Sequence, residues 1–181
     1  GKSVSHDTKL RLYFASIPVG RLKFGVALNG NGYSVSGTAN TSGVAKLFSS
    51  TVASFASSGT LPGTRIAAAS HKLSYKSKKK SGNVTISMAN GKLVKSTSKP
   101  PVYYKPGTVK VKPADLTSIL DPVSALVFPV KAGERDNGQS VCNRTLPLFD
   151  GKNRFNLVLG FKASKRARTR GFSGNAYTCS V

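Results

Sequence analysis

The chain has 181 residues, of which 28 are basic and only six are acidic, so its formal net charge is +22. This length suits a single domain, residues 1–181, that can bury a core without a metal ion or many disulfides. No run of eighteen apolar residues occurs, which argues against a membrane-spanning helix. Two histidines and two distant cysteines argue against a zinc site, and we expect no cofactor.

The first part of the chain is predicted to form antiparallel strands. Apolar and polar residues alternate over residues 10–14 and 22–28, and again in "YSVSG" after the turn. The turn itself is "NGNG" at 29–32, a strong hairpin signal because Asn and Gly accept a positive φ. This pattern predicts a meander with one apolar face.

The period of the apolar residues then changes. In "TSGVAKLFSSTVASFASSG", residues 41–59, the apolar side chains recur at helical spacing from Val44 to Phe55. Thr41 or Ser42 suits the N-cap, and Gly59 follows the end. The spacing predicts an amphipathic helix of about three turns that packs against the sheet.

Strands are expected to resume after residue 65. "KSKKKSGN" at 76–83 is predicted to be a basic hairpin loop, and Asn90-Gly91 the turn of the next hairpin. Residues 96–108 are expected to form a proline-rich connection. Two short helices with a bend at Asp121 are predicted after it, because Pro113 and Pro122 suit the first position of a helix. Asp121 is interpreted as a cap rather than a catalytic acid.

The last third is predicted to return to strands. Residues 132–149 and 154–164 are expected to form a hairpin across "DGKN", with Asp150 and Gly151 in the turn. "KRARTRGFSGN" at 165–175 is predicted to be a basic loop that precedes a final strand. Cys142 and Cys179 fit one disulfide that ties this strand to the segment before the hairpin, and two free thiols are the alternative. A disulfide would indicate an oxidising compartment.

Three separated elements carry a family resemblance. They are "YFASIPVGRLKFGVALNGNGYSVSGTANTSGVAKLF", "LTSILDPVSAL" and "CNRTLPLFDGKNRFNLVL", with a closing "CSV". Together they resemble an uncharacterised family of exported proteins of Gram-negative bacteria. The resemblance implies a periplasmic, β-rich protein of the cell envelope, and it strengthens the disulfide. The family offers no catalytic residues to carry over. The expected fold is therefore a curled antiparallel sheet or barrel-like domain around one or two short helices.

The sequence does not favour an enzyme. Its acids are scattered or suit caps and turns, His71 lies among serines, and no phosphate-binding loop or nucleophile elbow occurs. We therefore expect a non-catalytic protein. Its eight apolar strand residues would line a cavity between the sheet and its cover, or else fill it completely; these are Leu22, Phe24, Val26, Leu28, Phe155, Leu157, Leu159 and Phe161.

Two basic clusters are the candidate binding residues, and a positive field of this size attracts polyanions. They are Lys76, Lys78, Lys79 and Lys80 in the first cluster, and Lys165, Arg166, Arg168 and Arg170 in the second. The expected partners are an anionic envelope polymer, a lipid or a protein. Nucleic acid is the alternative, although neither cluster contains the interleaved aromatic residues that base stacking needs. An ordinary solvated surface explains scattered lysines equally well.

Overall fold

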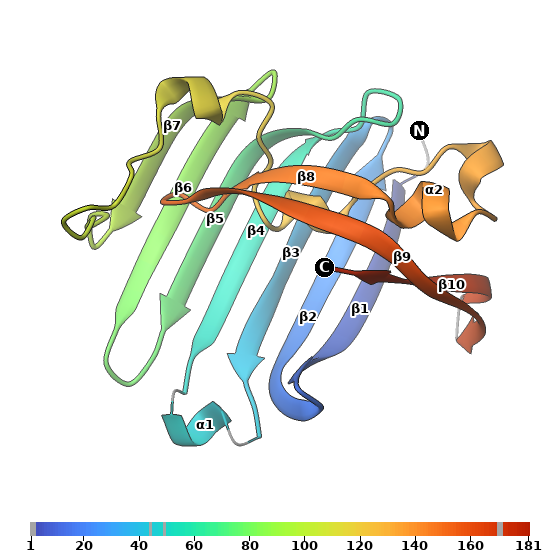
Figure 1. Cartoon of the computed structure of the whole chain (residues 1–181), viewed down its shortest axis with the longest axis horizontal. Coiled ribbons are helices and arrows are strands. Elements are labelled where there is room, and N and C mark those ends of the chain that lie inside the picture. The colour runs from blue at the N-terminus through green and yellow to red at the C-terminus, as the bar shows by residue number, and fades with distance from the viewer. Residues whose placement is uncertain (1–2, 44, 49, 170–171) are drawn as a thin grey trace.

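The computed structural model describes residues 3–43, 45–48, 50–169 and 172–181. Most of this chain is β-structure in two antiparallel sheets, with little helix (Figure 1). The strands are β1 (Ser3–Phe14), β2 (Ile17–Asn29), β3 (Gly32–Thr41), β4 (Val52–Thr60), β5 (Ala67–Lys76), β6 (Ser81–Ala89), β7 (Lys92–Lys99), β8 (Arg144–Phe149), β9 (Arg154–Thr169) and β10 (Phe172–Ser180). The short helices are α1 (Ala45–Phe48), α2 (Gly138–Cys142) and the 3-10 helices Pro113–Leu116, Ser124–Leu126 and Ala132–Glu134.

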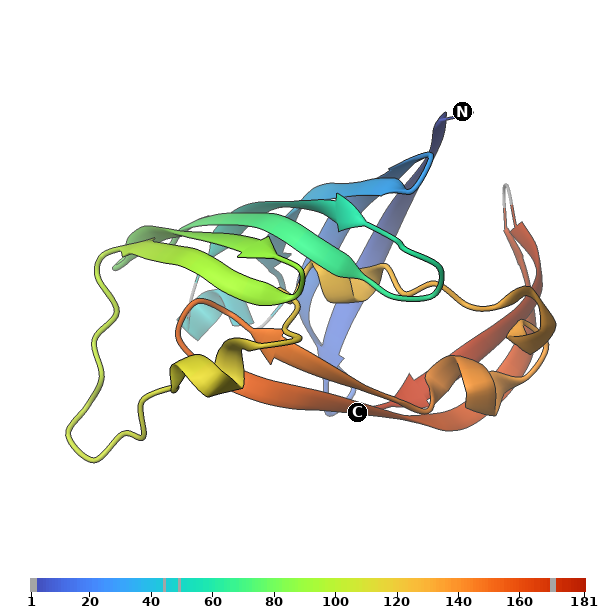
Figure 2. The same cartoon turned by 90° about the horizontal axis from the view of Figure 1, so that it is seen from above.

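The larger sheet contains seven strands in sequence order, β1 to β7, and the smaller one has the order β10-β9-β8. The larger sheet is not closed, because β1 and β7 are its two edges. Figure 2 shows the two sheets as separate layers, with the connection between β7 and β8 passing partly between them. The predicted curled antiparallel, β-rich fold is confirmed, and its larger sheet is open rather than closed into a barrel.

Alternation along the strands explains how the larger sheet acquires one apolar face. Tyr33 and Val35 of β3 are buried, as are Ile86 and Met88 of β6, while their chain neighbours point away from the core. The hairpin turns lie where the sequence predicts them. Gly30 and the pair Asn90-Gly91 adopt positive φ between consecutive strands, as tight hairpins require.

Two packed clusters form the core between the sheets. One surrounds Ile86 and Leu148, and the other surrounds Tyr33 and Phe55. Leu22, Phe24, Val26 and Leu28 pack against the second cluster, and Leu157 and Leu159 against the first. Phe155 and Phe161 remain 40% and 37% exposed. Six of the eight residues that we considered as cavity-lining therefore contribute to packing.

The predicted helix over residues 41–59 is wrong. Only α1 is helical there, and residues 52–60 form β4, with Val44 outside the described part of the chain. The physical reason is that residues 52–60 lie between two neighbouring strands of the larger sheet. β4 hydrogen-bonds along its whole length to β3 and β5, and Gly37 of β3 leaves room for the ring of Phe55 opposite it. Backbone pairing on two edges overrides a helical spacing of side chains.

Two other expectations need correction. Residues 165–169 belong to β9 and Phe172 begins β10, so the predicted basic loop is largely a strand pair. Residues 170–171, and with them Arg170, lie outside the described part. In the segment 132–149, only residues 144–149 form a strand, because Asn137 caps α2 through its side-chain oxygen. The expected helices near Asp121 are single 3-10 turns.

The disulfide predicted between Cys142 and Cys179 is present. It joins the end of α2 to β10, with the two Cα atoms 5.4 Å apart. The helix packs closely on the sheet at this point, since a Cβ at Gly138 would collide with the rings of Phe161 and Tyr177. None of the described helices has the length and apolar character to cross a bilayer. The described residues include no group of His, Cys, Asp and Glu side chains placed to hold a metal ion.

Candidate functional site

A cationic cleft lies beside the edge strand β7. Its volume is about 760 Å³, and its floor is the core-facing side of the larger sheet where the smaller sheet no longer covers it. Tyr75, Val84 and Ser98 lie on this floor, on the same face as the buried side chains of β5 and β6. Pockets of this size accommodate small molecules and lipid fragments. We call this feature the cationic cleft.

Three chain segments form the walls of the cationic cleft: the β5–β6 loop, the segment after β7, and the turn between β8 and β9. In the β5–β6 loop, Ser77 and Lys80 bind each other, since the Ser77 N–H and hydroxyl both donate to the Lys80 carbonyl and the Lys80 N–H donates to the Ser77 hydroxyl. After β7, the Ser98 hydroxyl donates to the carbonyl of Pro100. These bonds fix the backbone that carries the wall side chains.

The turn between β8 and β9 is built by Asp150. One of its carboxylate oxygens accepts hydrogen bonds from the backbone N–H groups of Lys152 and Asn153, at 2.8 and 2.6 Å. The other accepts from the side chain of Asn153 at 3.1 Å. Gly151 has φ +97°, and a Cβ there would collide with Val84. Asp150 and Gly151 therefore have the turn role that the sequence predicts, and Asp150 is occupied by hydrogen bonds of its own loop.

Four lysines line the cationic cleft: Lys79, Lys80, Lys99 and Lys152. None of them forms an ion pair with a carboxylate in the described part of the chain. Lys152 is held over the ring of Tyr104 at 5.7 Å, and the Tyr104 hydroxyl donates to the Lys152 carbonyl. The lining also includes apolar groups of Val84, Val102, Pro100 and Pro101, with Tyr75 and Tyr103. The cleft thus combines unneutralised cations with apolar surface.

The structure separates the two predicted basic clusters. Lys79 and Lys80 line the cationic cleft, but Lys76 and Lys78 do not, and Lys76 lies on the opposite face of β5 from Tyr75. Lys165, Arg166 and Arg168 lie on β9, and Figure 1 shows the β9–β10 hairpin and the β5–β6 connection at opposite ends of the molecule. Lys99 and Lys152 also line the cleft but were not among the predicted binding residues, although Lys152 follows the predicted Asp150-Gly151 turn.

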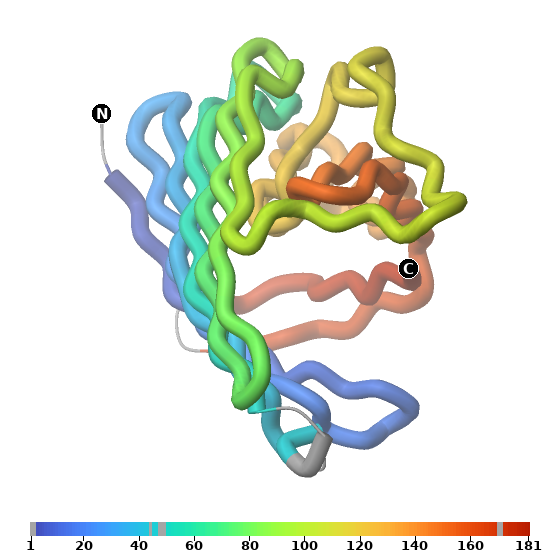
Figure 3. The backbone as a smooth tube through the Cα atoms, turned by 90° about the vertical axis from the view of Figure 1, so that its left-hand side faces the viewer, coloured from blue at the N-terminus to red at the C-terminus, as the bar shows by residue number. Residues whose placement is uncertain are grey.

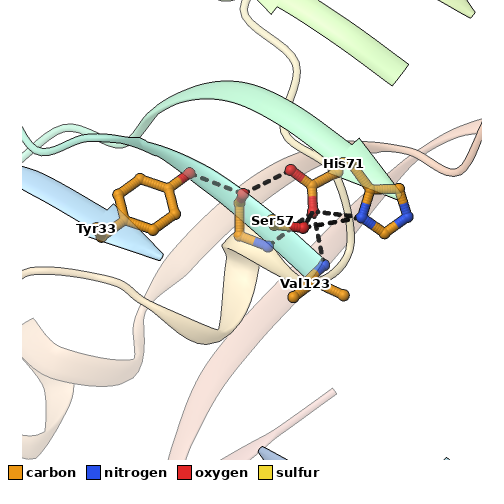
Figure 4. A network of polar contacts seen from close by, with 6 residues as sticks. Tyr33, Ser57, His71 and Val123 are labelled. Carbon is orange, nitrogen blue, oxygen red and sulfur yellow. Dashed lines mark hydrogen bonds and ion pairs between the residues drawn. The ribbon is translucent and has the colours of Figure 1, made fainter. Parts of the chain in front are cut away.

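A buried polar network is the second candidate site, after the cationic cleft, and it joins residues that are far apart in the sequence (Figure 4). Asp121 is fully buried and accepts from the hydroxyls of Ser57 and Ser124 and from the backbone N–H groups of Val123 and Ser124. The Tyr33 hydroxyl donates to Ser124 at 2.7 Å. Since the single hydrogen of Ser57 goes to Asp121, the 2.8 Å contact between Ser57 and His71 requires a proton on Nδ1 of His71.

The network controls the protonation of its members. Burial raises the pKa of Asp121, but the hydrogen bonds from His71 and Ser124 outweigh it, so the pKa is lowered from its usual value of 3.8. Burial raises the pKa of Tyr33 to about 12, against the hydrogen bond to Ser124 and with a contribution from the charge of Asp121. Asp121 is therefore an ionised, saturated carboxylate in the interior. The predicted capping role is correct in kind, since its Oδ1 accepts the N–H of Val123, the N-cap of the 3-10 turn, and that of Ser124, the first residue of the turn.

The residues Ser57, His71 and Asp121 do not have the geometry of a hydrolytic triad. In such triads one ring nitrogen of histidine contacts the acid and the other contacts the nucleophile. Here both Ser57 Oγ and Asp121 Oδ1 face Nδ1 of His71, at 2.8 and 3.2 Å. Ser57 and His71 are 4% and 3% exposed. This arrangement serves to hold the chain between the two sheets.

The sequence matches a known protein family. The family described as "Protein of unknown function (DUF3108)" matches residues 9–181, which is nearly the whole chain. Comparison with curated proteins and with solved structures yields no match.

Proposed function

The chain belongs to the DUF3108 family of proteins of unknown function, and from its geometry we propose that it is a non-catalytic binding protein of the cell envelope that takes an amphiphilic anion in the cationic cleft. The observation that carries this proposal is the composition of the cleft. Four lysines without carboxylate partners in the described chain line the cleft together with apolar groups of valine, tyrosine and proline. A ligand with a phosphate or carboxylate head and an apolar body matches both halves of this surface.

Asp150 is the only acid in the lining of the cationic cleft, and it does not favour a cationic ligand over an anionic one. The carboxylate of Asp150 is occupied by three hydrogen bonds within its own turn. It stabilises the loop that presents Lys152, and its negative charge is shared among those donors. The four lysine ammonium groups, in contrast, have no carboxylate partner among the described residues, and Lys152 contacts only the face of the Tyr104 ring, so they can donate to ligand oxygens.

We propose a periplasmic location for this function. The disulfide between Cys142 and Cys179 supports it, because disulfides persist in oxidising compartments such as the periplasm. The resemblance of the sequence to exported proteins supports it as well. Anionic lipid head groups and phosphorylated or carboxylated polysaccharides are the envelope components whose chemistry fits the cleft.

We propose a non-catalytic role because Ser57, His71 and Asp121, which meet in the interior, are buried and bound to one another. The hydroxyls of Ser57 and Ser124 and the carboxylate of Asp121 are paired within the network, with Asp121 accepting four hydrogen bonds. The cationic cleft offers lysines and hydroxyls for binding, and its carboxylate is committed to a turn.

The test measures binding of dihexanoyl phosphatidic acid, a short-chain anionic lipid, by isothermal titration calorimetry. Three lysines of the cleft are replaced together as Lys79→Ala, Lys80→Ala and Lys152→Ala. We expect the affinity to fall about tenfold or more, since each charge-assisted contact is lost. Dihexanoyl phosphatidylcholine, which has the same chains but no net charge, should bind the wild-type protein at least about tenfold more weakly.

A matched control removes three positive charges at the other end of the molecule as Lys165→Ala, Arg166→Ala and Arg168→Ala. This variant should retain the wild-type affinity within about twofold, because those side chains do not line the cleft. Equal losses in both triple variants would show that binding follows net charge alone and would refute the cleft as a site. A single-stranded oligonucleotide that binds more tightly than the lipid and depends on the β9 residues would establish the nucleic-acid alternative instead.

A further inference from the structure

The tip of the β1–β2 hairpin carries an unusual set of exposed apolar side chains. Tyr13, Phe14 and Ile17 are 56%, 76% and 47% exposed, and Leu12 beside them is 43% exposed. They lie at or next to a two-residue turn, with Phe14 paired to Ile17 across it. Figure 3 shows this blue hairpin extending beyond the other strands at the lower end of the molecule. Exposed apolar groups concentrated at one tip indicate a contact surface.

The turn holds these side chains in register at a conformational cost. Its central residues, Ala15 and Ser16, have φ of +46° and +66°, in the left-handed region that residues other than glycine adopt with strain. Positive φ at both positions is what a tight hairpin turn requires. The backbone therefore keeps Phe14 and Ile17 side by side at the end of the hairpin.

Behind the tip, the hairpin carries four cations on the face that points away from the core. Lys9 lies directly opposite Lys23, and Arg11 directly opposite Arg21. All four are exposed, and they line a shallow groove of about 390 Å³. Like charges directly opposite each other on neighbouring strands repel. No acid occurs in residues 8–24, and the nearest one in the sequence, Asp7, lies opposite Gly25.

From this placement we propose that the β1–β2 hairpin docks the protein on an anionic phospholipid bilayer. The tip side chains enter the interface, and the four cations contact the lipid phosphates. Apolar side chains next to basic ones are typical of segments that bind in the plane of a membrane. Tyrosine suits the boundary between the lipid head groups and the acyl chains. A dissolved anionic polymer would account for the cations but not for exposed Phe14 and Ile17.

The same end of the larger sheet carries further positive charge. Because the strands run antiparallel in sequence order, the β1–β2, β3–β4 and β5–β6 connections lie at one end (Figure 1). Lys46 of α1 and the loop with Lys79 and Lys80 belong to this end. Docking through the hairpin therefore brings the wall of the cationic cleft toward the lipid surface, although the docking itself does not depend on the cleft.

The absence of tryptophan from the chain allows a direct test. A Phe14→Trp variant has a single reporter at the tip. We expect its fluorescence to shift to the blue and to be quenched by brominated lipids when vesicles of phosphatidylglycerol and phosphatidylcholine are added. Pure phosphatidylcholine vesicles should produce little change. A Phe172→Trp variant at the start of β10, where the native side chain is 46% exposed, should keep its water-like emission.

Vesicle sedimentation separates the contributions of the tip and the cations. Phe14→Ser with Ile17→Ser should lower partitioning into the anionic vesicles about tenfold or more. The control Val94→Ser with Val158→Ser removes two exposed valines elsewhere and should stay within about twofold of the wild-type protein. Replacement of Arg11→Gln and Arg21→Gln should weaken partitioning and its dependence on salt.

Three outcomes would overturn the proposal. The first is an unshifted Phe14→Trp emission with anionic vesicles. The second is a blue shift that grows with protein concentration in the absence of lipid, which would mean that a second copy covers the tip. The third is loss of vesicle binding in the cleft variant with Lys79, Lys80 and Lys152 replaced while the tip variant still binds. Vesicle binding retained by the cleft variant supports docking even if the short-chain lipid titration fails.

Discussion

At the scale of single residues, Asp121 is the side chain on which the arrangement between the sheets most depends. It is fully buried and connects Ser57 of β4 with the turn that contains Ser124. Tyr33 of β3 and His71 of β5 bind the two serines from either side. A buried carboxylate is tolerated only when its acceptor capacity is filled. The network therefore fixes the connection between β7 and β8 against three strands of the larger sheet.

We predict that Asp121→Asn lowers the free energy of unfolding at neutral pH by about 3 kcal/mol, because the amide nitrogen replaces one acceptor oxygen and leaves its buried donors unsatisfied. These donors are the Ser124 hydroxyl at Oδ2, or the Ser57 hydroxyl and two N–H groups at Oδ1. The folded-state pKa of Asp121 is lowered, so its contribution is fully present above the usual value of 3.8 and is lost as the pH falls below it. The difference between variant and wild type should therefore shrink at acidic pH. Urea unfolding at several pH values measures it.

A control distinguishes the charge from the packing of the network. Ser124→Ala removes one hydroxyl from the carboxylate and leaves the charge in place, so it should destabilise the fold less than Asp121→Asn does. An Asp121→Asn protein as stable as the wild type at neutral pH would show that the network does not hold the connection. A difference that grows toward acidic pH would contradict the lowered pKa.

At the scale of elements, the smaller sheet depends on the disulfide more than the larger sheet does. β10 hydrogen-bonds only to β9, so one of its edges is unpaired in the described chain. Cys179 near the end of β10 is tied to Cys142 at the end of α2, 37 residues earlier. The edge of Tyr177 meets Phe161 at 6.3 Å between ring centres. The covalent link therefore secures a strand with few other contacts.

We predict that Cys142→Ser with Cys179→Ser lowers the free energy of unfolding by about 4 kcal/mol in the chain-entropy account of a loop this long. Hydrogen exchange should locate the effect, with faster exchange of amides in β9 residues 160–169 and in β10. Amides in β3 to β5 should change least relative to global unfolding, because those strands are paired on both edges. Uniform acceleration across both sheets would contradict this local role.

The elements that the sequence predicts well are those whose signals are local. Alternation over residues 22–28 and the Asn90-Gly91 turn identify a strand and a hairpin because period and turn chemistry lie within a few residues. The helix expected over residues 41–59 failed because its apolar spacing combined residues of α1 with residues of β4. What decides β4 is its pairing with β3 and β5, and no local pattern reports two neighbouring strands.

The same distinction between local patterns and long-range contacts explains which residues of the candidate site were predicted from the sequence. Lys79 and Lys80 stand out in the sequence because they belong to a run of lysines, but Lys99 and Lys152 join them only through the fold. Tyr33 and Ser124 are 91 positions apart, and Ser57 and Asp121 are 64 apart. Each residue alone suits a strand or a cap. The sequence therefore predicts the local role of each residue but not the contacts between them in the buried network.

At the scale of the whole molecule, two incomplete layers leave polar and apolar surface exposed together. The smaller sheet covers part of the larger one (Figure 2). The cationic cleft occupies the core-facing surface that remains free beside β7. The net charge of +22 includes the lysines of the β5–β6 loop and the basic residues of β9, two segments that lie at opposite ends of the molecule (Figure 1). Positive charge alone attracts any polyanion. The cationic cleft differs from the basic residues of β9 because its lysines adjoin apolar surface, whereas the cations of β9 lie on an exposed strand.

The most direct measurement of this account is an amide chemical-shift titration of the isotopically labelled protein with dihexanoyl phosphatidic acid. We predict that the largest shifts occur at residues 77–84, at residues 98–99 and 102–103, and at Gly151 and Lys152, which surround the cationic cleft. Amides of residues 163–169 in β9 should move little. Shifts that are largest in β9 and β10, or equal over all basic segments, would contradict binding in the cleft.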